Sequence, residues 1–203
     1  MKTRRFCRII HYLHGLLFHS SRVSILSDSI QALISSGLGL DIGTGDGKIP
    51  EILMKKNPET EIFGVELSNR YQKSDKIIVY DGKILPFKDK SVDFIMLVDV
   101  LHHIEKSREV LQECLRVAKK KIIIKDHLCE GKGDFFRLKL MDWVGNVDKG
   151  VALPYHYLSM KQWADLFKEC GVQKFSHQKV YLYKGLPGLI AGGHLQVIFE
   201  LIL

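Results

Sequence analysis

The chain has 203 residues, of which 46% are hydrophobic and 26% charged, a balance that suits one globular domain and excludes extensive disorder. The formal net charge is +7, but residues 1–22 hold five basic and no acidic residues, which leaves 25 basic against 23 acidic residues, or +2, elsewhere. A nucleic-acid-binding protein would show a broad basic face, so no nucleic-acid partner is expected. The four cysteines lack metal-binding spacing and are expected to be free thiols in a reducing cytoplasm.

The first 36 residues are expected to form helices packed on or beside the core. Apolar residues at helical spacing, with basic residues on the opposite side, indicate an amphipathic helix in residues 1–22. That helix either contacts the inner face of a membrane peripherally or docks on the core. The stretch Ile9–Ser21 contains three histidines and no evident cleavage site, which argues against a signal peptide, and it is too short and polar to span a bilayer. A second short helix is expected over Ile25–Ile34.

From residue 37 onward, strand and helix patterns alternate. The expected strands are Gly37–Ile42, Glu61–Leu67, Lys76–Asp81, Ser91–Val98, Lys121–Lys125, Phe175–Tyr183 and Leu195–Leu201. The expected helices are Lys48–Lys56, Glu105–Val117 and Ser159–Cys170, the last with Ser159 as its N-cap and Gly171 as its stop. Residues 128–158 have poor periodicity and are expected to be an irregular insertion. The alternation predicts an α/β fold whose mostly parallel sheet is covered on both faces.

A glycine-rich loop, Gly43–Gly47, follows the first strand, which carries Asp41 near its end. Glycines allow positive φ and close approach of the backbone to a ligand, and the next helix supplies unpaired N–H groups. The dinucleotide pattern G-x-G-x-x-G fails because Lys48 replaces the third glycine, and the phosphate-binding P-loop pattern fails because Ile49 follows Lys48.

An acidic strand residue followed by G-x-G-x-G resembles the first motif of class I S-adenosylmethionine-dependent methyltransferases. Three further features match in order: Glu66 ends the second strand, Asp81-Gly82 ends the third, and Val92–His103 looks like the fourth strand and its loop in the type 11 group. That group includes menaquinone and ubiquinone methylases. The resemblance covers about residues 37–127 and implies one domain over 37–203, a Rossmann-like, doubly wound, seven-stranded, mostly parallel sheet with an antiparallel last strand.

The resemblance implies S-adenosylmethionine as the cofactor. In the family, an acid at the position of Glu66 accepts both ribose hydroxyls, and the position of Asp81 meets the adenine amine. The expected cofactor-binding residues are Asp41, Gly43, Thr44, Gly45, Gly47, Glu66, Leu67, Asp81, Gly82 and Asp99. Taken singly, the loop could be a tight turn, Glu66 a solvated charge and Asp81 a turn residue, but four motifs in order favour a site.

Methyl transfer mainly requires alignment of the acceptor with the methyl group, and a base only where the acceptor is a hydroxyl or an acidic carbon. Candidate bases follow strands four and five, whose carboxyl ends should meet at the cleft. They are Asp126, which is favoured because its strand is otherwise apolar, and His103, His102 and His127, which could equally be structural. No metal is expected, because Asp99, Asp126 and Asn146 imitate a magnesium-dependent catechol site without a supporting motif.

The predicted function is methyl transfer to a small or lipophilic acceptor. The insertion 128–158 carries aromatic residues that either line the acceptor pocket or anchor the segment in the core, namely Phe135, Phe136, Trp143, Tyr155 and Tyr157. Asp142, Asn146 and His156 would orient a polar group of the acceptor. The alternatives are a protein or RNA methylase, and a non-catalytic module that binds S-adenosylmethionine.

Overall fold

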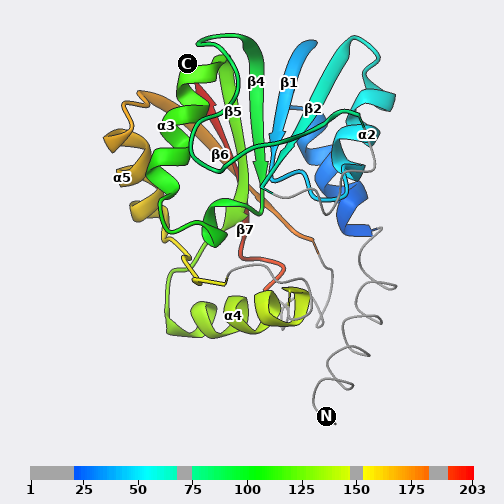
Figure 1. Ribbon diagram of the computed structural model, residues 1–203. Helices are drawn as coiled ribbons and strands as arrows, with labels where there is room; N and C mark the ends of the chain where they lie inside the picture. The colour runs from blue at the N-terminus through cyan, green and yellow to red at the C-terminus, as the bar shows by residue number, and fades with distance from the viewer. Residues whose placement is uncertain (1–20, 68–74, 147–152, 183–191) are drawn as a thin grey trace.

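The computed structural model describes residues 21–67, 75–146, 153–182 and 192–203, which contain a seven-stranded sheet with the order β3-β2-β1-β4-β5-β7-β6 (Figure 1). The strands are β1 (Gly37–Ile42), β2 (Thr60–Glu66), β3 (Ile77–Val79), β4 (Val92–Val98), β5 (Ala118–His127), β6 (Lys174–Val180) and β7 (Gln196–Ile202). The first five strands pair in parallel, whereas β7 is antiparallel to both β5 and β6. The Rossmann-like sheet with an antiparallel last strand, predicted from the sequence, is confirmed.

Helices cover both faces of the sheet (Figure 1). They are the helical residues 21–31 and α2 (Lys48–Lys56) on one face, and α3 (Ser107–Val117) and α5 (Met160–Glu169) on the other. The short helix η2 (Leu101–His103) follows β4, and α4 (Lys132–Asn146) lies below the sheet in Figure 1, beyond the edge where β1 and β5 end. None of the helices within these described ranges is long and apolar enough to cross a membrane.

The core forms two layers because side chains alternate across each strand. In β4, Ile95 and Leu97 face the layer of α3 and α5, whereas Phe94 and Met96 face the opposite layer. The second layer also receives Leu26 and Ile30 of helix 21–31 and Leu53 of α2. Helix 21–31 is therefore part of the core, and the amphipathic helix predicted in residues 1–22 lies almost wholly outside the described residues.

The ends of α5 follow the sequence signals. The Ser159 hydroxyl accepts the backbone N–H of Gln162, and the Gln162 side chain accepts the backbone N–H of Ser159, which completes a capping box. Gly171 stands just past the helix with φ +84°, a conformation that favours glycine. Trp163 of α5 is buried and its Nε1–H donates to the carbonyl of His127 at 3.1 Å, so this helix is tied to the end of β5.

The segment 128–158 differs from the expected irregular insertion, because residues 132–146 form α4. Apolar residues lie all around this helix and only Leu138 is buried, so the sequence carries no 3.6-residue periodicity. Phe136 and Trp143 are 67% and 39% exposed, which rules out the interpretation that these two aromatic residues are core anchors. Tyr157, after α4, is buried.

The sheet order positions the functional residues. The chain leaves β1 toward β2 on one side, and β4 lies on its other side, so the strand order reverses between β1 and β4. Ligands of doubly wound folds bind at such a reversal, outside the carboxyl ends of the strands. The residues that follow β1, β2, β4 and β5 therefore lie along one edge of the sheet.

Candidate functional site

The loop between β1 and α2 has an open backbone. Gly43, Gly45 and Gly47 have φ values of +70°, +59° and +72°, a region that side-chain-bearing residues rarely adopt. A Cβ added to Gly43 would lie 2.7 Å from a methyl group of Val100, whereas one added to Gly45 would meet nothing within 4 Å. Gly43 is therefore required by packing against the end of β4, and Gly45 leaves its surface free for a ligand at the start of α2.

The carboxylate of Glu66, at the end of β2, accepts a hydrogen bond from the backbone of this loop. Its Oε1 accepts the N–H of Gly45 at 2.7 Å, and its Oε2 accepts the N–H of Leu67 at 3.2 Å. A carboxylate has about four lone-pair positions, so each oxygen keeps one for a ligand hydroxyl. A Cβ on Gly82 would lie 2.7 Å from Leu67, which shows that these two expected cofactor residues are adjacent.

Asp81 lies two residues after the end of β3 and begins a turn. Its Oδ1 accepts the backbone N–H groups of Lys83 and Ile84 at 2.9 and 3.3 Å. These backbone hydrogen bonds lower the pKa of Asp81 below its ordinary value. One oxygen thus has the turn role that the sequence left open, and the side chain is exposed.

Asp41 is buried inside β1 with only 2% of its surface exposed. Its Oδ1 and the hydroxyl oxygen of Thr44 have no hydrogen-bond partner among the described residues. Burial raises the pKa of Asp41 to about 7; the neighbouring Thr44 hydroxyl opposes this rise, and the nearby charge of Glu66 adds to it. Buried polar atoms are usually paired, so these two atoms provide hydrogen-bonding capacity beneath the glycine loop.

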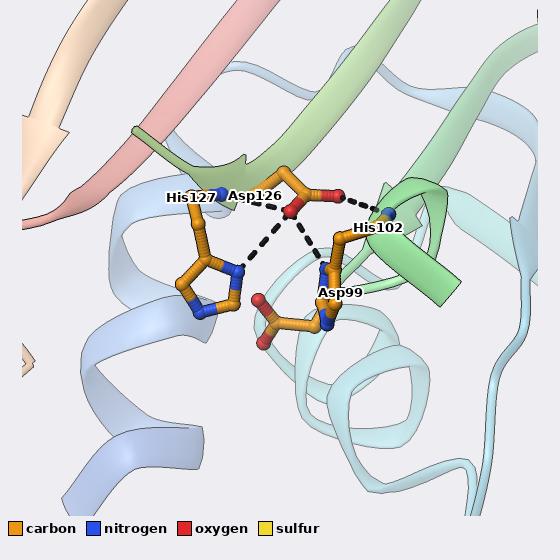
Figure 2. A group of neighbouring side chains, drawn as sticks. All are labelled: Asp99, His102, Asp126 and His127. Carbon is orange, nitrogen blue, oxygen red and sulfur yellow. Dashed lines mark hydrogen bonds and ion pairs between the residues drawn. The ribbon is translucent and has the colours of Figure 1, made fainter. Parts of the chain in front are cut away.

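A second cluster of side chains gathers at the ends of β4 and β5 (Figure 2). Asp126 Oδ1 is 2.7 Å from His102 Nδ1 and 3.2 Å from His127 Nδ1, and it also accepts the backbone N–H of His127 at 2.8 Å. Despite burial, the charge and hydrogen bonds of the two histidines hold the pKa of Asp126 below its ordinary value. Asp126 is therefore an acceptor shared by both rings.

His102 lies between two carboxylates. On the side away from Asp126, its Nε2 is 3.4 Å from Asp142 Oδ1, and the Tyr157 hydroxyl donates to Asp142 Oδ2 at 2.5 Å. Burial opposes a charge on His102, but Asp126 and Asp142 prevail and raise the pKa of the imidazole to about 10. The ring of His103 stands 4.0 Å from that of His102, centroid to centroid.

Asp99 belongs to this second cluster rather than to the glycine loop. It has φ +57°, and its carboxylate forms ion pairs with Lys125 and Arg22. Burial disfavours its charge, yet these two cations hold the pKa of Asp99 well below its ordinary value. Neither partner was predicted from the sequence, although Lys125, a lysine that continues the apolar run of β5, was an available signal. Lys125 is 1% exposed and also donates to Gln196 at 2.6 Å.

The expected site residues thus form two neighbouring groups. The cofactor candidates from Asp41 to Gly82 lie around the loop after β1, and the candidate bases lie with Asp99 after β4 and β5. Val100, next to Asp99, packs against Gly43 and joins the two groups.

Comparison with known proteins identifies the loop and its strands. Residues 40–124 match the model of a family described as "Methyltransferase domain". Over these residues the chain is therefore similar to methyltransferase domains. The match covers β1 to β5 and includes the glycine loop, Glu66, Asp81 and both histidines after β4, as the resemblance had predicted.

A relative found by sequence and solved structures found by fold match larger parts of the chain than the family model does. The chain is 32% identical over 136 residues to a demethylmenaquinone methyltransferase of Thermotoga maritima, and the match spans 59% of this chain and 59% of that relative. Among solved structures, a protein of the same organism described as a SAM-dependent methyltransferase, "possible histamine N-methyltransferase", has a TM-score of 0.67 at 21% identity, with 97% of each chain covered. The plantazolicin methyltransferase BpumL, solved in complex with SAH, has a TM-score of 0.65 at 15% identity, with 96% of this chain and 90% of that chain covered. At these identities the structural matches establish the fold alone.

Proposed function

We propose that the protein is an S-adenosylmethionine-dependent methyltransferase that acts on a small or lipophilic acceptor. The observation that carries the proposal is the contact of the Glu66 carboxylate with the N–H of Gly45 at 2.7 Å, because it brings the acid at the end of β2 onto the glycine loop. The match of residues 40–124 to the methyltransferase domain family supports the same conclusion.

The residues present fit this cofactor. Asp41 Oδ1 and Thr44 Oγ1 are buried without a partner among the described residues, and the Gly45 backbone is open on its outer side. Glu66 has acceptor capacity for ribose hydroxyls, and Leu67, Asp81 and Gly82 stand beside it for the adenine end. The bound cofactor supplies a methyl group already activated by its sulfonium.

The chain's own contribution to the reaction is to align the acceptor and, for a hydroxyl or acidic carbon, to remove a proton. A base must touch the acceptor, and the side chains of His102 and Asp126 are each only 1% exposed. The side chain of His127 is 13% exposed and His103 is half-buried, so these two histidines are the candidates for acceptor contact. Asp126 then serves as a positioning residue, since it fixes the ring orientation of both His102 and His127.

Two features support a lipophilic acceptor. The relative from Thermotoga maritima is named for demethylmenaquinone, a lipophilic substrate. In addition, α4 exposes Phe136, Leu140 and Trp143 beyond the edge of the sheet where the candidate bases lie (Figure 1). We propose that the segment 128–158, which includes this helix, shapes the acceptor site.

Peripheral membrane contact through residues 1–22 is proposed from their sequence, and so is the division of the chain at residue 36. Arg22, the basic residue of that stretch within the described ranges, pairs with Asp99 and therefore serves the site rather than a membrane. Any contact with anionic lipid would rest on the other basic residues of the stretch.

The proposal is tested first by binding. In a thermal-shift assay, S-adenosylmethionine and S-adenosylhomocysteine should stabilise the protein by about 2.7 kcal/mol at roughly 100 times their dissociation constants, and NAD should not. Radiolabelled S-adenosylmethionine is then incubated with the protein and with lipid, small-molecule, protein and RNA fractions of a cell extract. Label in the lipid or small-molecule fraction supports the proposal, and label confined to protein or RNA contradicts the acceptor class.

A further inference from the structure

Two groups of side chains able to bind a metal lie at the ends of β4 and β5, and they share one residue. In each group, one ligand atom from every member lies within 4.8 Å of the others. The groups are Asp99, His102, Asp126 and His127, and His102, His103 and Asp142. They differ in what engages their polar atoms: cations from outside the group bind Asp99 in the first, whereas in the second the contact of His102 Nε2 is with Asp142, another member of the group.

The first group is occupied by its own hydrogen bonds (Figure 2). Asp126 Oδ1 is already in contact with the Nδ1 atoms of His102 and His127. The carboxylate of Asp99 is bound by the cations of Lys125 and Arg22. A metal ion placed there would meet two positive charges and displace existing bonds, so this group is an ionic network and not a metal site.

The second group lies at the other nitrogen of the same ring. Because Asp126 holds Nδ1 of His102, the ring presents Nε2 to Asp142, at 3.4 Å from Oδ1. A metal ion bound between these two atoms would replace the proton that Nε2 shares with Asp142. Two ligands about 2.05 Å from a tetrahedral zinc ion are themselves about 3.4 Å apart. The separation of these two atoms thus equals the edge of a zinc tetrahedron, and His103 stands beside them as a third ligand.

We propose that His102 Nε2, His103 and Asp142 form a binding site for a divalent transition-metal ion of the zinc type. Three protein ligands leave one coordination position for water or for a polar group of a bound molecule. Imidazole nitrogen ligands select zinc and its neighbours, whereas magnesium prefers oxygen ligands only. The expectation from sequence that the chain holds no metal is therefore revised by this proposal.

Two of the proposed ligands, His102 and Asp142, each have a hydrogen-bond partner on the side away from the metal position; we call these residues, Asp126 and Tyr157, the outer partners. A histidine ligand usually donates its second ring N–H to a carboxylate, which fixes the tautomer and the ring orientation. Asp126 has this position at 2.7 Å from His102 Nδ1. In the same way, the Tyr157 hydroxyl occupies Asp142 Oδ2 at 2.5 Å and leaves Oδ1 for the metal. Both outer partners are buried, so their orientation is fixed before any ion binds.

The site would also explain how α4 is held in place. This helix buries only Leu138, yet Asp142 brings it against η2, which carries both histidines. A metal ion bound there would bridge the end of β4 and the helix proposed to shape the acceptor site. Metal binding does not depend on methyl transfer, so the proposal stands apart from the proposed function.

Zinc binding by the untagged full-length chain, stripped with a chelator, tests the proposal. After equilibrium dialysis against Zn²⁺ and against Mg²⁺, metal content is measured by mass spectrometry. We expect one zinc per chain and no bound magnesium. Asp142→Asn and His103→Ala should each weaken zinc binding at least ten-fold, and Tyr157→Phe should weaken it by about ten-fold through loss of an outer partner.

Two matched controls should retain wild-type zinc affinity. Asp134→Asn makes the same change on the same helix, where Asp134 pairs with Arg137 instead of a histidine. Cys129→Ser removes a half-buried thiol that could bind zinc by itself.

The proposal is overturned if the wild-type chain takes up no zinc, if it takes up magnesium in preference, or if Cys129→Ser abolishes uptake. It is also overturned if His103→Ala, which changes a half-buried residue and should fold, binds zinc as tightly as the wild type. Circular dichroism identifies a variant that has not folded, and His103→Ala then decides the outcome in place of Asp142→Asn. Binding of S-adenosylmethionine to the stripped protein is measured separately, so failure of the metal site and failure of the proposed function give different results.

Discussion

The substitution Asp41→Asn should remove a pH-dependent loss of stability. Asp41 lies in β1 with 2% of its surface exposed, and its pKa rises from 3.8 to about 7, mainly because burial disfavours the charged form. The difference of about 3 pKa units corresponds to about 4 kcal/mol at 1.36 kcal/mol per unit. This is the order of magnitude by which an ionised Asp41 destabilises the fold.

The sign follows from proton binding in the two states. In the unfolded chain Asp41 ionises near pH 4, whereas in the folded protein it stays protonated up to about pH 7. Between these values the folded state binds more protons, so the contribution of Asp41 to the free energy of unfolding falls by up to about 1.4 kcal/mol per pH unit as the pH rises. Its stabilising contribution is complete below about pH 4 and lost above about pH 7.

Urea unfolding of the ligand-free wild type and Asp41→Asn, at several pH values between about 4 and about 8, measures this effect. The stability of the variant relative to the wild type should increase across that range by an amount that approaches 4 kcal/mol, because all other titrating groups are shared. Asp46→Asn, in the same loop but with a half-exposed side chain, is the control and should show no such trend. Parallel pH profiles for the wild type and Asp41→Asn would refute the reasoning.

Four further outcomes are expected. Glu66→Gln should weaken binding of S-adenosylmethionine by about 1–3 kcal/mol in calorimetry, because a carboxylate that accepts the ribose hydroxyls is lost. The control Glu61→Gln, at the exposed start of β2, should leave the affinity unchanged. Equal affinities for both variants would remove Glu66 from the site. Trp163→Ala should cost about 3–5 kcal/mol of unfolding free energy, because Trp163 is 1% exposed. Trp143→Ala, at a 39% exposed position, should leave stability and cofactor affinity nearly unchanged and slow turnover of the acceptor; normal turnover would show that Trp143 lies outside the acceptor site. Finally, the full-length chain should sediment with anionic liposomes and a chain lacking residues 1–20 should not, whereas equal sedimentation would contradict the proposed membrane contact.

The cofactor half of the site could be predicted because its signals are local. β1 and α2 have the bounds that the sequence indicated, since the apolar run of Gly37–Ile42 ends in a loop whose glycines must adopt positive φ. β3 is shorter than the expected strand Lys76–Asp81, and β5 is longer than the expected strand Lys121–Lys125. Both differences lie at strand ends that include charged residues, where no apolar pattern indicates the boundary. The register of β4 and β5 then explains why Asp99 and Asp126 meet, as the carboxyl-edge argument anticipated.

The contacts of the second cluster could not be predicted, because they join distant segments through buried charges. Nothing local indicates that Asp142 of α4 approaches His102, or that Arg22 reaches Asp99. Asp126 was favoured as a base because it ends an apolar strand, whereas the structure surrounds it with donors. A charged residue after an apolar strand can therefore indicate either a reactive group or the acceptor that orients one, and only the tertiary contacts distinguish the two.

Because α4 buries a single side chain, its sequence can change more freely during evolution than that of the core. Because the helix buries one side chain, substitutions at its exposed positions 136, 140 and 143 leave the packed sheet unaffected. Mutations that lie outside the core usually change stability by no more than about 0.5 kcal/mol, so selection on folding scarcely constrains them. The glycine loop has no such freedom, since a side chain at Gly43 would collide with Val100. The helix proposed to shape the acceptor site can thus change during evolution while the glycine loop stays fixed.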